Sequence, residues 1–344
     1  MQSEFEIGGE RVASGSRRLI DIPVARLSNH SPVALPVHVI HGERPGPALF
    51  VSAAIHGDEI LGVEIIRRLL NSKGLDNIKG TLLCVPVVNV FGFLSQTRYL
   101  PDRRDLNRVF PGSPEGSLAA QLAHLFLNEV VGRSNFGIDL HTGAINRENL
   151  PQIRADFANE ALRRFAEAFA APVLLQSSIP QGSLREAAAE RGVGILLYEA
   201  GEALRLNELA VRAGVRGIQN VMHELDMLPA RFASRPKAMP VFSHASRWSR
   251  APEAGLFRAF KTLGDSVSKG DMIGIVSDPY EGIDTPVTAP TDGIIIGRIN
   301  VSVVNRAEAL FHVAEFRRLG TAETSIESIS SELENHEMDE EEIA

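Results

Sequence analysis

Short apolar runs alternate with amphipathic segments through the first two thirds of the chain. Residues 48–55 carry almost no polar side chain, which is typical of a strand buried on both faces. Apolar residues then recur at helical spacing over residues 58–73, and Gly74 provides a stop signal. Further strands are predicted at 81–88, 136–140 and 195–198, and further helices at 156–170, 183–191 and 207–227. This alternation predicts an α/β fold with a mixed, largely parallel sheet flanked by helices on both faces.

The pattern changes near residue 235. Seven glycines separate short β-rich runs between residues 240 and 316, as in an all-β module with tight turns. Near the N-terminus, valines and leucines are scattered between prolines, as expected for edge strands. We therefore expect four parts, namely edge strands (1–45) joined to a main domain (46–235), a smaller all-β domain (236–318) and a C-terminal tail (319–344).

Composition favours an ordinary globular protein of the cytoplasm. The chain has 344 residues, of which 44% are hydrophobic and 23% charged, and its longest apolar run is far too short to span a membrane. The first seven residues lack the basic and apolar regions of a signal peptide. The single cysteine, Cys84, cannot form an internal disulfide. We expect no association with a membrane.

The net charge of −8 comes from the C-terminal tail. Nine of the 43 acidic residues follow Arg318, and no Lys or Arg does, which leaves 34 acidic against 35 basic residues in the rest of the chain. A body of such balanced charge argues against nucleic-acid binding. The tail at 319–344 is acidic with few large apolar residues, so we expect it to be disordered or loosely helical, with docking to a partner as the alternative.

Polar groups lie where several predicted strands end. They are His56, Glu59, Asp139, His141 and Glu199, together with an arginine-rich segment at residues 98–108. In an open α/β sheet, ligands bind at the carboxyl ends of the strands. We therefore expect these groups to face a common site.

Metal chemistry is one interpretation of this set. The spacing of His56 and Glu59 lets an imidazole and a carboxylate converge on one cation, although packing and a favoured helix N-terminus explain the pair equally well. Two His and one Glu are the ligands of a catalytic zinc that keeps a position for water. A second Glu could deprotonate that water, and guanidinium groups could stabilise an oxyanion or bind a substrate carboxylate.

The order of these pieces carries a family resemblance. His56-Gly-Asp-Glu59, Asp105-Leu-Asn-Arg108, Asp139-Leu-His141 and Glu199 together resemble the succinylglutamate desuccinylase/aspartoacylase family, a branch of the zinc-carboxypeptidase-like fold. Thr97-Arg98-Tyr99 matches one more piece of the family pattern, with two extra residues before the Asp105 motif. The resemblance spans roughly residues 50–201 and implies that residues 46–235 form a zinc-dependent catalytic domain.

The resemblance also implies a role for each matching residue. His56, Glu59 and His141 would bind one Zn²⁺ per subunit, and Glu199 would be the general base and then the general acid. Arg98 would polarise the scissile carbonyl. The substrate carboxylate would be held by Asn107 and Arg108.

The assignment of Arg98 and the role of the neighbouring motif residue Asp139 leave alternatives open. The two-residue insertion makes Arg103 and Arg104 substitutes for Arg98 beside the oxyanion. Asp139 could orient a metal ligand or lie in solvent, since it shares a strand face with His141.

The all-β segment has a second, weaker resemblance. Gly264-Asp-Ser-Val-Ser-Lys-Gly-Asp271 and Ala289-Pro-Thr-Asp-Gly293 resemble a biotinyl/lipoyl-type carrier sandwich. The stretch between them at residues 276–280 contains no lysine for a cofactor, so we expect no carrier role. The module could instead shape access to the site or form the contact of a homo-oligomer.

Three functions compete at this point. The first is a zinc-dependent deacylase, an amidohydrolase that removes an acyl group from a small N-acyl amino acid. The second is a metallo-carboxypeptidase that cleaves a C-terminal residue from a peptide. The third is a catalytically silent binding protein on the same fold. The intact ligand set and Glu199 argue against the silent protein. The expected cytoplasmic location and the expected absence of a pro-segment argue against the carboxypeptidase.

Overall fold

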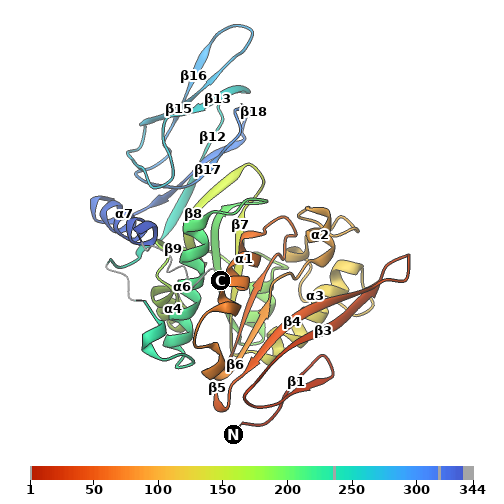
Figure 1. Ribbon diagram of the computed structural model, residues 1–344. Coiled ribbons are helices and arrows are strands. Elements are labelled where there is room, and N and C mark those ends of the chain that lie inside the picture. Colours follow the sequence, from red (N-terminus) through yellow and green to blue (C-terminus); the bar gives the residue numbers. More distant parts are fainter. Residues whose placement is uncertain (1, 235–237, 317–318, 336–344) are drawn as a thin grey trace.

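A computed structural model describes residues 2–234, 238–316 and 319–335 (Figure 1). Its main feature is one sheet of 13 strands, with the order β12-β19-β17-β8-β10-β7-β5-β6-β4-β3 along its main path. The strands of this sheet are β3 (Ser16–Arg26), β4 (Pro32–His41), β5 (Arg44–Ala53), β6 (Lys79–Val85), β7 (Phe136–Gly143), β8 (Arg147–Ala155), β9 (Val173–Gln176), β10 (Gly194–Glu202), β11 (Val241–Ser243), β12 (Ala245–Arg250), β14 (Ser266–Val267), β17 (Gly293–Ile299) and β19 (Ala309–Glu315).

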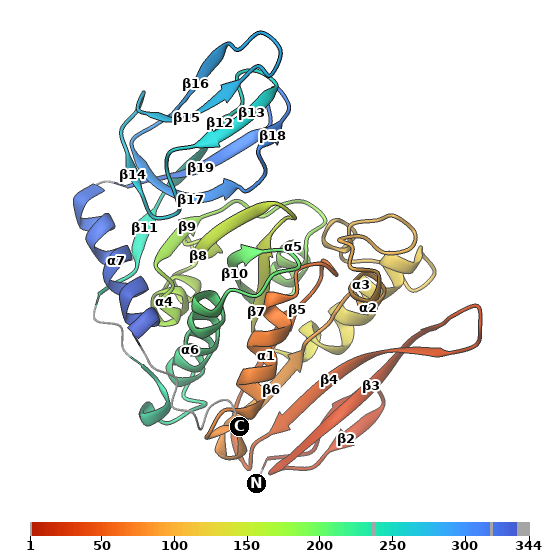
Figure 2. The same ribbon diagram turned by 45° about the horizontal axis from the view of Figure 1, so that its top comes forward.

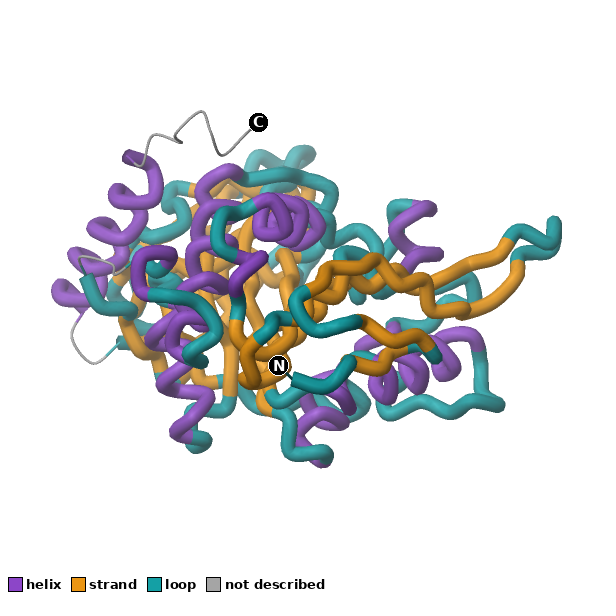
Figure 3. The backbone as a smooth tube through the Cα atoms, turned by 60° about the horizontal axis from the view of Figure 1, so that its bottom comes forward, coloured by secondary structure: helices purple, strands orange, loops and turns teal. Residues whose placement is uncertain are grey.

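Two smaller sheets complete the β structure. One pairs β1 (Phe5–Ile7) with β2 (Glu10–Val12), and the other contains β13 (Gly255–Ala259), β15 (Met272–Ser277), β16 (Asp284–Thr288) and β18 (Val303–Val304). The long β3–β4 hairpin extends beyond the body of the molecule (Figures 1 and 3).

The centre of the large sheet confirms the predicted α/β fold. Strands β6, β5, β7 and β10 run parallel, whereas β4 and β8 flank them in antiparallel pairing. Because the four central strands are parallel, their carboxyl ends meet at one edge of the sheet. The polar groups at the strand ends are therefore brought to a common place.

Helices cover both faces of this sheet. The core on one face is formed with α1 (Leu61–Asn71), α4 (Glu160–Phe169) and α6 (Glu208–Glu224), and α1 and α6 lie side by side there (Figure 2). The other face packs against α3 (Leu118–Glu129) and α5 (Leu184–Glu190). A short helix, α2 (Val90–Ser95), precedes the arginine-rich segment at residues 98–108, and a one-turn 3-10 helix at Leu106–Arg108 ends it.

Residues 241–315, called the β module below, are all-β but are not separate from the main sheet. Strand β17 pairs with β8, and β11 pairs with β9, so the hydrogen-bonded ladder runs from the module into the main domain. Neither β8 nor β9 was expected from the sequence. The two strands provide the edge to which the module is joined.

The first part of the tail is an ordered helix. Residues 319–335 form helix α7 (Leu319–Asn335), in which Ala322, Ile326, Ile329 and Leu333 are buried against the main domain and the module. Glu332 pairs with Arg216 of α6. Of the two expected states, disordered or loosely helical, this part of the tail adopts the helix, because its apolar stripe with a spacing of three to four residues packs against the main domain and the module.

The remaining tail at 336–344 lies outside the described residues. No helix in the part of the chain that the structure describes is long and apolar enough to cross a membrane.

Candidate metal-dependent active site

The three predicted metal ligands come together at the carboxyl ends of β5 and β7. After β5 the chain turns through Ala54, and His56 and Glu59 precede the first turn of α1. His141 lies near the end of β7. All three side chains are buried, and their ligand atoms lie within 4.8 Å of one another.

The carboxylate of Glu59 bridges the two imidazoles. Nδ1 of His56 is 2.7 Å from Glu59 Oε1, and Nδ1 of His141 is 2.7 Å from Glu59 Oε2. The backbone N–H of Thr142 also donates to Oε2, at 3.1 Å. Burial raises the pKa of Glu59, but the neighbouring imidazoles outweigh burial and hold this pKa below its ordinary value. Burial lowers the pKa of both histidines, yet the carboxylates around them raise each above its ordinary value.

Two aspartates bind the far nitrogens of these imidazoles. His56 Nε2 is 3.1 Å from Asp105 Oδ1, and His141 Nε2 is 2.8 Å from Asp139 Oδ2. Asp139 is buried and accepts a further bond from Ser52 Oγ at 2.8 Å, so it orients His141 and does not lie in solvent. An Nε2–H that donates to a carboxylate leaves the Nδ1 lone pair for a cation. The donor set therefore fits a divalent metal ion.

Arg98 is the arginine of the loop that reaches this triad. Its Nε and Nη2 lie 3.1 and 2.9 Å from Asp105 Oδ2, and its Nη1 lies 3.2 Å from Glu59 Oε1. Arg103 and Arg104 are exposed instead, and Arg104 pairs with Asp102. Arg98 therefore reaches the triad despite the two-residue insertion, and the inserted part of the loop contains exposed residues.

Glu199 faces the same side of the sheet as His141. The two residues are directly paired in the neighbouring parallel strands β10 and β7, and paired residues share a sheet face. Glu199 Oε2 accepts a bond from Asn149 Nδ2 at 2.6 Å and lies 3.3 Å from Arg154 Nη2. Among the described residues, no hydrogen bond occupies the other oxygen, Oε1. Asn149 and Arg154 both come from β8, and sequence reasoning found neither.

The two residues expected to bind a substrate carboxylate have different surroundings. Asn107 Oδ1 accepts from the backbone N–H of Leu184 at 2.9 Å, which ties the loop to the start of α5. The Arg108 side chain is exposed and donates to the Asn107 carbonyl at 2.6 Å. Their role toward a carboxylate stays a prediction.

Arg185 is a further cation that the sequence did not single out. Its side chain is only 9% exposed, its Nη2 donates to the Ser178 carbonyl at 3.3 Å, and its buried Nη1 has no partner among the described residues. Burial lowers the pKa of Arg185, and the nearby guanidinium of Arg154 lowers this pKa further. A buried guanidinium nitrogen without a partner suits a bound anion.

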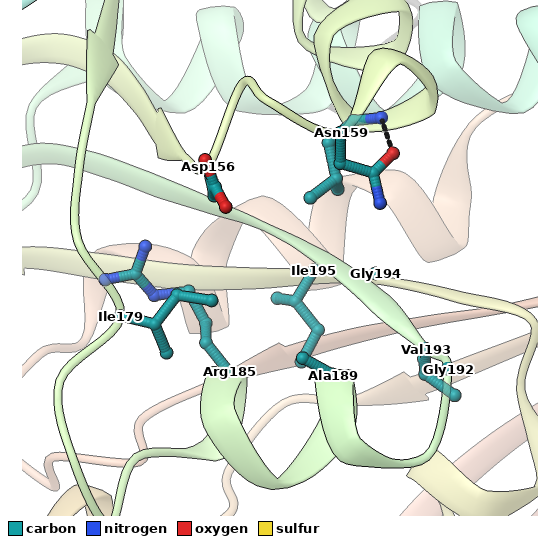
Figure 4. Close-up of a pocket in the computed structure, with 10 residues that line it drawn as sticks. Asp156, Asn159, Ile179, Arg185, Ala189, Gly192, Val193, Gly194 and Ile195 are labelled. Carbon is teal, nitrogen blue, oxygen red and sulfur yellow. Dashed lines mark hydrogen bonds between the residues drawn. The ribbon is translucent and has the colours of Figure 1, made fainter.

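Arg185 also lines a cavity of about 170 Å³ (Figure 4). This cavity lies between α4, α5 and the start of β10, with Asp156 across from Arg185. None of the three candidate metal ligands lines it, and neither does Glu199. The cavity is therefore distinct from the candidate metal site.

Comparisons with known proteins point to one family. The model of the succinylglutamate desuccinylase/aspartoacylase catalytic domain matches residues 45–225. N-alpha-acetyl-L-2,4-diaminobutyric acid deacetylase of Halomonas elongata is 27% identical over 296 residues, which cover 82% of this chain and 86% of that protein.

Solved structures extend the likeness over most of the molecule. A succinylglutamate desuccinylase/aspartoacylase from Rhodobacter sphaeroides is 27% identical, with a TM-score of 0.78 over 87% of this chain and 96% of its own. The product-bound ectoine utilization protein EutE (DoeB) from Ruegeria pomeroyi shares the fold at 22% identity, with a TM-score of 0.77 over 87% and 94% of the two chains. The chain therefore belongs to the succinylglutamate desuccinylase/aspartoacylase family.

Proposed function

We propose that this protein is a zinc-dependent hydrolase that removes the acyl group from a small N-acyl amino acid. The observation that carries the proposal is the convergence of His56, Glu59 and His141, with Glu199 at the register of His141 on the next strand. Two imidazoles, a carboxylate and a separate glutamate are the parts of a zinc hydrolase. The Halomonas elongata relative, which is named as a deacetylase of an acetylated diaminobutyric acid, supports an amide substrate.

Zn²⁺ would be held by Nδ1 of His56, Nδ1 of His141 and the carboxylate of Glu59. When bound, the ion supplies Lewis acidity toward the amide carbonyl and toward water. Asp105 and Asp139 keep the two imidazoles oriented by accepting their Nε2–H bonds.

Glu199 would move the proton. Its Oε2 is occupied by Asn149 and Arg154, so Oε1 is the oxygen available to take a proton from water and return it to the leaving amine. Arg98 lies against Glu59 and would stabilise negative charge on the carbonyl oxygen.

A carboxylate on the substrate would bind to the positively charged arginine side chains beside Glu199. Arg185 is buried with an unpartnered nitrogen; burial and the nearby guanidiniums of Arg154 and Arg108 lower its pKa, whereas Glu199 and Asp139 raise it. Asn107 and Arg108 of the family motif would complete this subsite. Arginine binds carboxylates through two parallel hydrogen bonds, which gives orientation as well as charge.

The test combines metal analysis with a substrate panel. We expect the purified protein to contain zinc and to release free amine from N-acetyl or N-succinyl amino acids, with loss of turnover after chelation and recovery on adding Zn²⁺. Release of a C-terminal residue from peptides, without deacylation, would instead identify a carboxypeptidase. A metal-loaded protein that turns over neither class would be a silent binding protein.

A further inference from the structure

Asn149 reaches Glu199 because β8 is irregular. Between β8 and β10, Glu199 pairs with Gln152 and Gly201 pairs with Asn149, so a step of two residues on β10 meets a step of three on β8. Such a bulge changes which side chains face each side of a strand. It turns Asn149 to the face of Glu199, where its amide nitrogen lies 2.6 Å from the carboxylate.

On the side away from β10, Asn149 lies against the β module. Its strand β17 pairs Gly297 directly with Asn149. A Cβ atom at Gly297 would lie 2.8 Å from Asn149 Oδ1 and 3.2 Å from the Cβ of His312. The Asn149 side chain, only 8% exposed, therefore lies close against the space that the glycine leaves open. With Gly297 beside its oxygen, the amide points its nitrogen to Glu199.

Further bonds fix β17 against β8 and β10. Just after β17, the backbone N–H of Asn300 donates to the Asn146 carbonyl at 2.8 Å. The Asn300 side chain donates to Glu202 Oε2, also at 2.8 Å, and Glu202 accepts from the backbone N–H of Asn146 at 2.9 Å. Hydrogen bonds on both sides of Asn149 thus hold β8, β10 and β17 together.

We propose that the β module is a working part of the active site, in which β17 fixes Asn149 and Asn149 orients the carboxylate of Glu199. Asn149 is a positioning residue, since it acts through Glu199. This inference rests on the proposed function only for the role of Glu199 as the base. The positioning of Asn149 is a role for the module that differs from both a cofactor carrier and a subunit contact.

The kinetic test uses Asn149→Ala, Gly297→Ala and the double variant. Each single change should lower kcat by about 10- to 100-fold, the scale of a misplacement of about 1 Å, with KM and metal content close to wild type. If Gly297 acts through Asn149, the double variant should be no slower than Asn149→Ala alone. Glu148→Ala is the matched control, because Glu148 precedes Asn149 in β8 and its side chain points to the opposite face. This control should retain wild-type kcat.

Several results would overturn the proposal. They are a wild-type kcat in either single variant, multiplicative losses in the double variant, or an equal loss in Glu148→Ala. If Gly297→Ala alone does not fold, recovery of folding in the double variant supports the same contact, and failure of both contradicts it.

A crystal structure of Asn149→Ala gives a readout that does not depend on the reaction. We expect the Glu199 carboxylate to rotate away from its position in the wild type. An unmoved carboxylate would reject the positioning role even if the protein is an active deacylase. A protein without deacylase activity would reject the proposed function, while a displaced Glu199 would still support the positioning role.

Discussion

Asp139 binds the nitrogen of His141 that faces away from the metal-binding triad. Asp139→Asn should lower zinc affinity by about 10- to 100-fold, because carboxylates in this position fix the orientation and basicity of a ligating imidazole. Competition with a chromophoric chelator measures the affinity. Asp156→Asn, on the far cavity, is the control and should bind zinc like the wild type. Equal affinity in the two variants would contradict the role of Asp139.

Glu199 is the residue on which the proposed chemistry depends most. Glu199→Gln preserves the shape of the side chain and should leave zinc and substrate binding intact, while kcat falls by about two to four orders of magnitude. The measurement is kcat on an N-acyl amino acid that the wild type hydrolyses, with zinc content determined for each preparation. Near wild-type turnover would remove Glu199 from the mechanism.

Arg108 and Arg185 should act on binding more than on chemistry. Lysine keeps the charge but loses the planar fork, so Arg108→Lys and Arg185→Lys should each raise KM more than they lower kcat. The effect should vanish for a substrate analogue whose carboxylate is replaced by a carboxamide. An unchanged KM for carboxylate substrates in both variants would reject the subsite.

At the scale of elements, the sequence predicted those parts of the site that follow simple apolar strands. His56, His141 and Glu199 stand at or near the ends of such strands, so their convergence could be inferred. Strand β8 could not, because Pro151 and charged residues such as Arg154 disrupt both the alternating and the continuous apolar pattern. It is a strand because β10 and β17 pair with it on both edges.

The same reason explains which site residues the sequence missed. Asn149 and Arg154 both belong to β8, and the place of Asn149 beside Glu199 depends in addition on a bulge that the sequence pattern does not indicate. Arg185 lies on a predicted helix, but only the packing of that helix against the sheet buries its guanidinium. Asp105 stands in the recognised motif, and its contact with His56 required the fold of the loop.

Helix α7 gives a prediction about stability at this scale. Ile329 is 1% exposed and packs into the core that contains α6. Ile329→Ala should lower the free energy of unfolding by about 2–5 kcal/mol, as for other large-to-small changes in a core. Urea denaturation measures the change, and Glu327→Ala on the exposed side of the helix is the control. Equal stability of the two variants would mean that α7 does not dock as described.

At the scale of the whole molecule, the module and the main domain share one sheet. A chain that ends at residue 235 would leave the β17-paired part of β8 (residues 147–149) and the outer edge of β9 unpaired, and would expose Leu150, Val173 and Leu175, which share a core with residues of β17 and α7. We expect this truncated chain not to fold into a stable monomer, as judged by its thermal transition and its state of association. A cooperative transition in a monomeric truncated protein would contradict this expectation.

The direct pairing of Glu199 with His141 also bears on how such a protein can diversify. Neighbouring strands lie about 4.8 Å apart, so the separation between Glu199 and His141 is set by the sheet and not by any loop. Loops that carry none of the site residues can therefore change in length and composition while this pair keeps its spacing. Descendants of one ancestral catalyst could in this way acquire different acyl groups and amino acids as substrates.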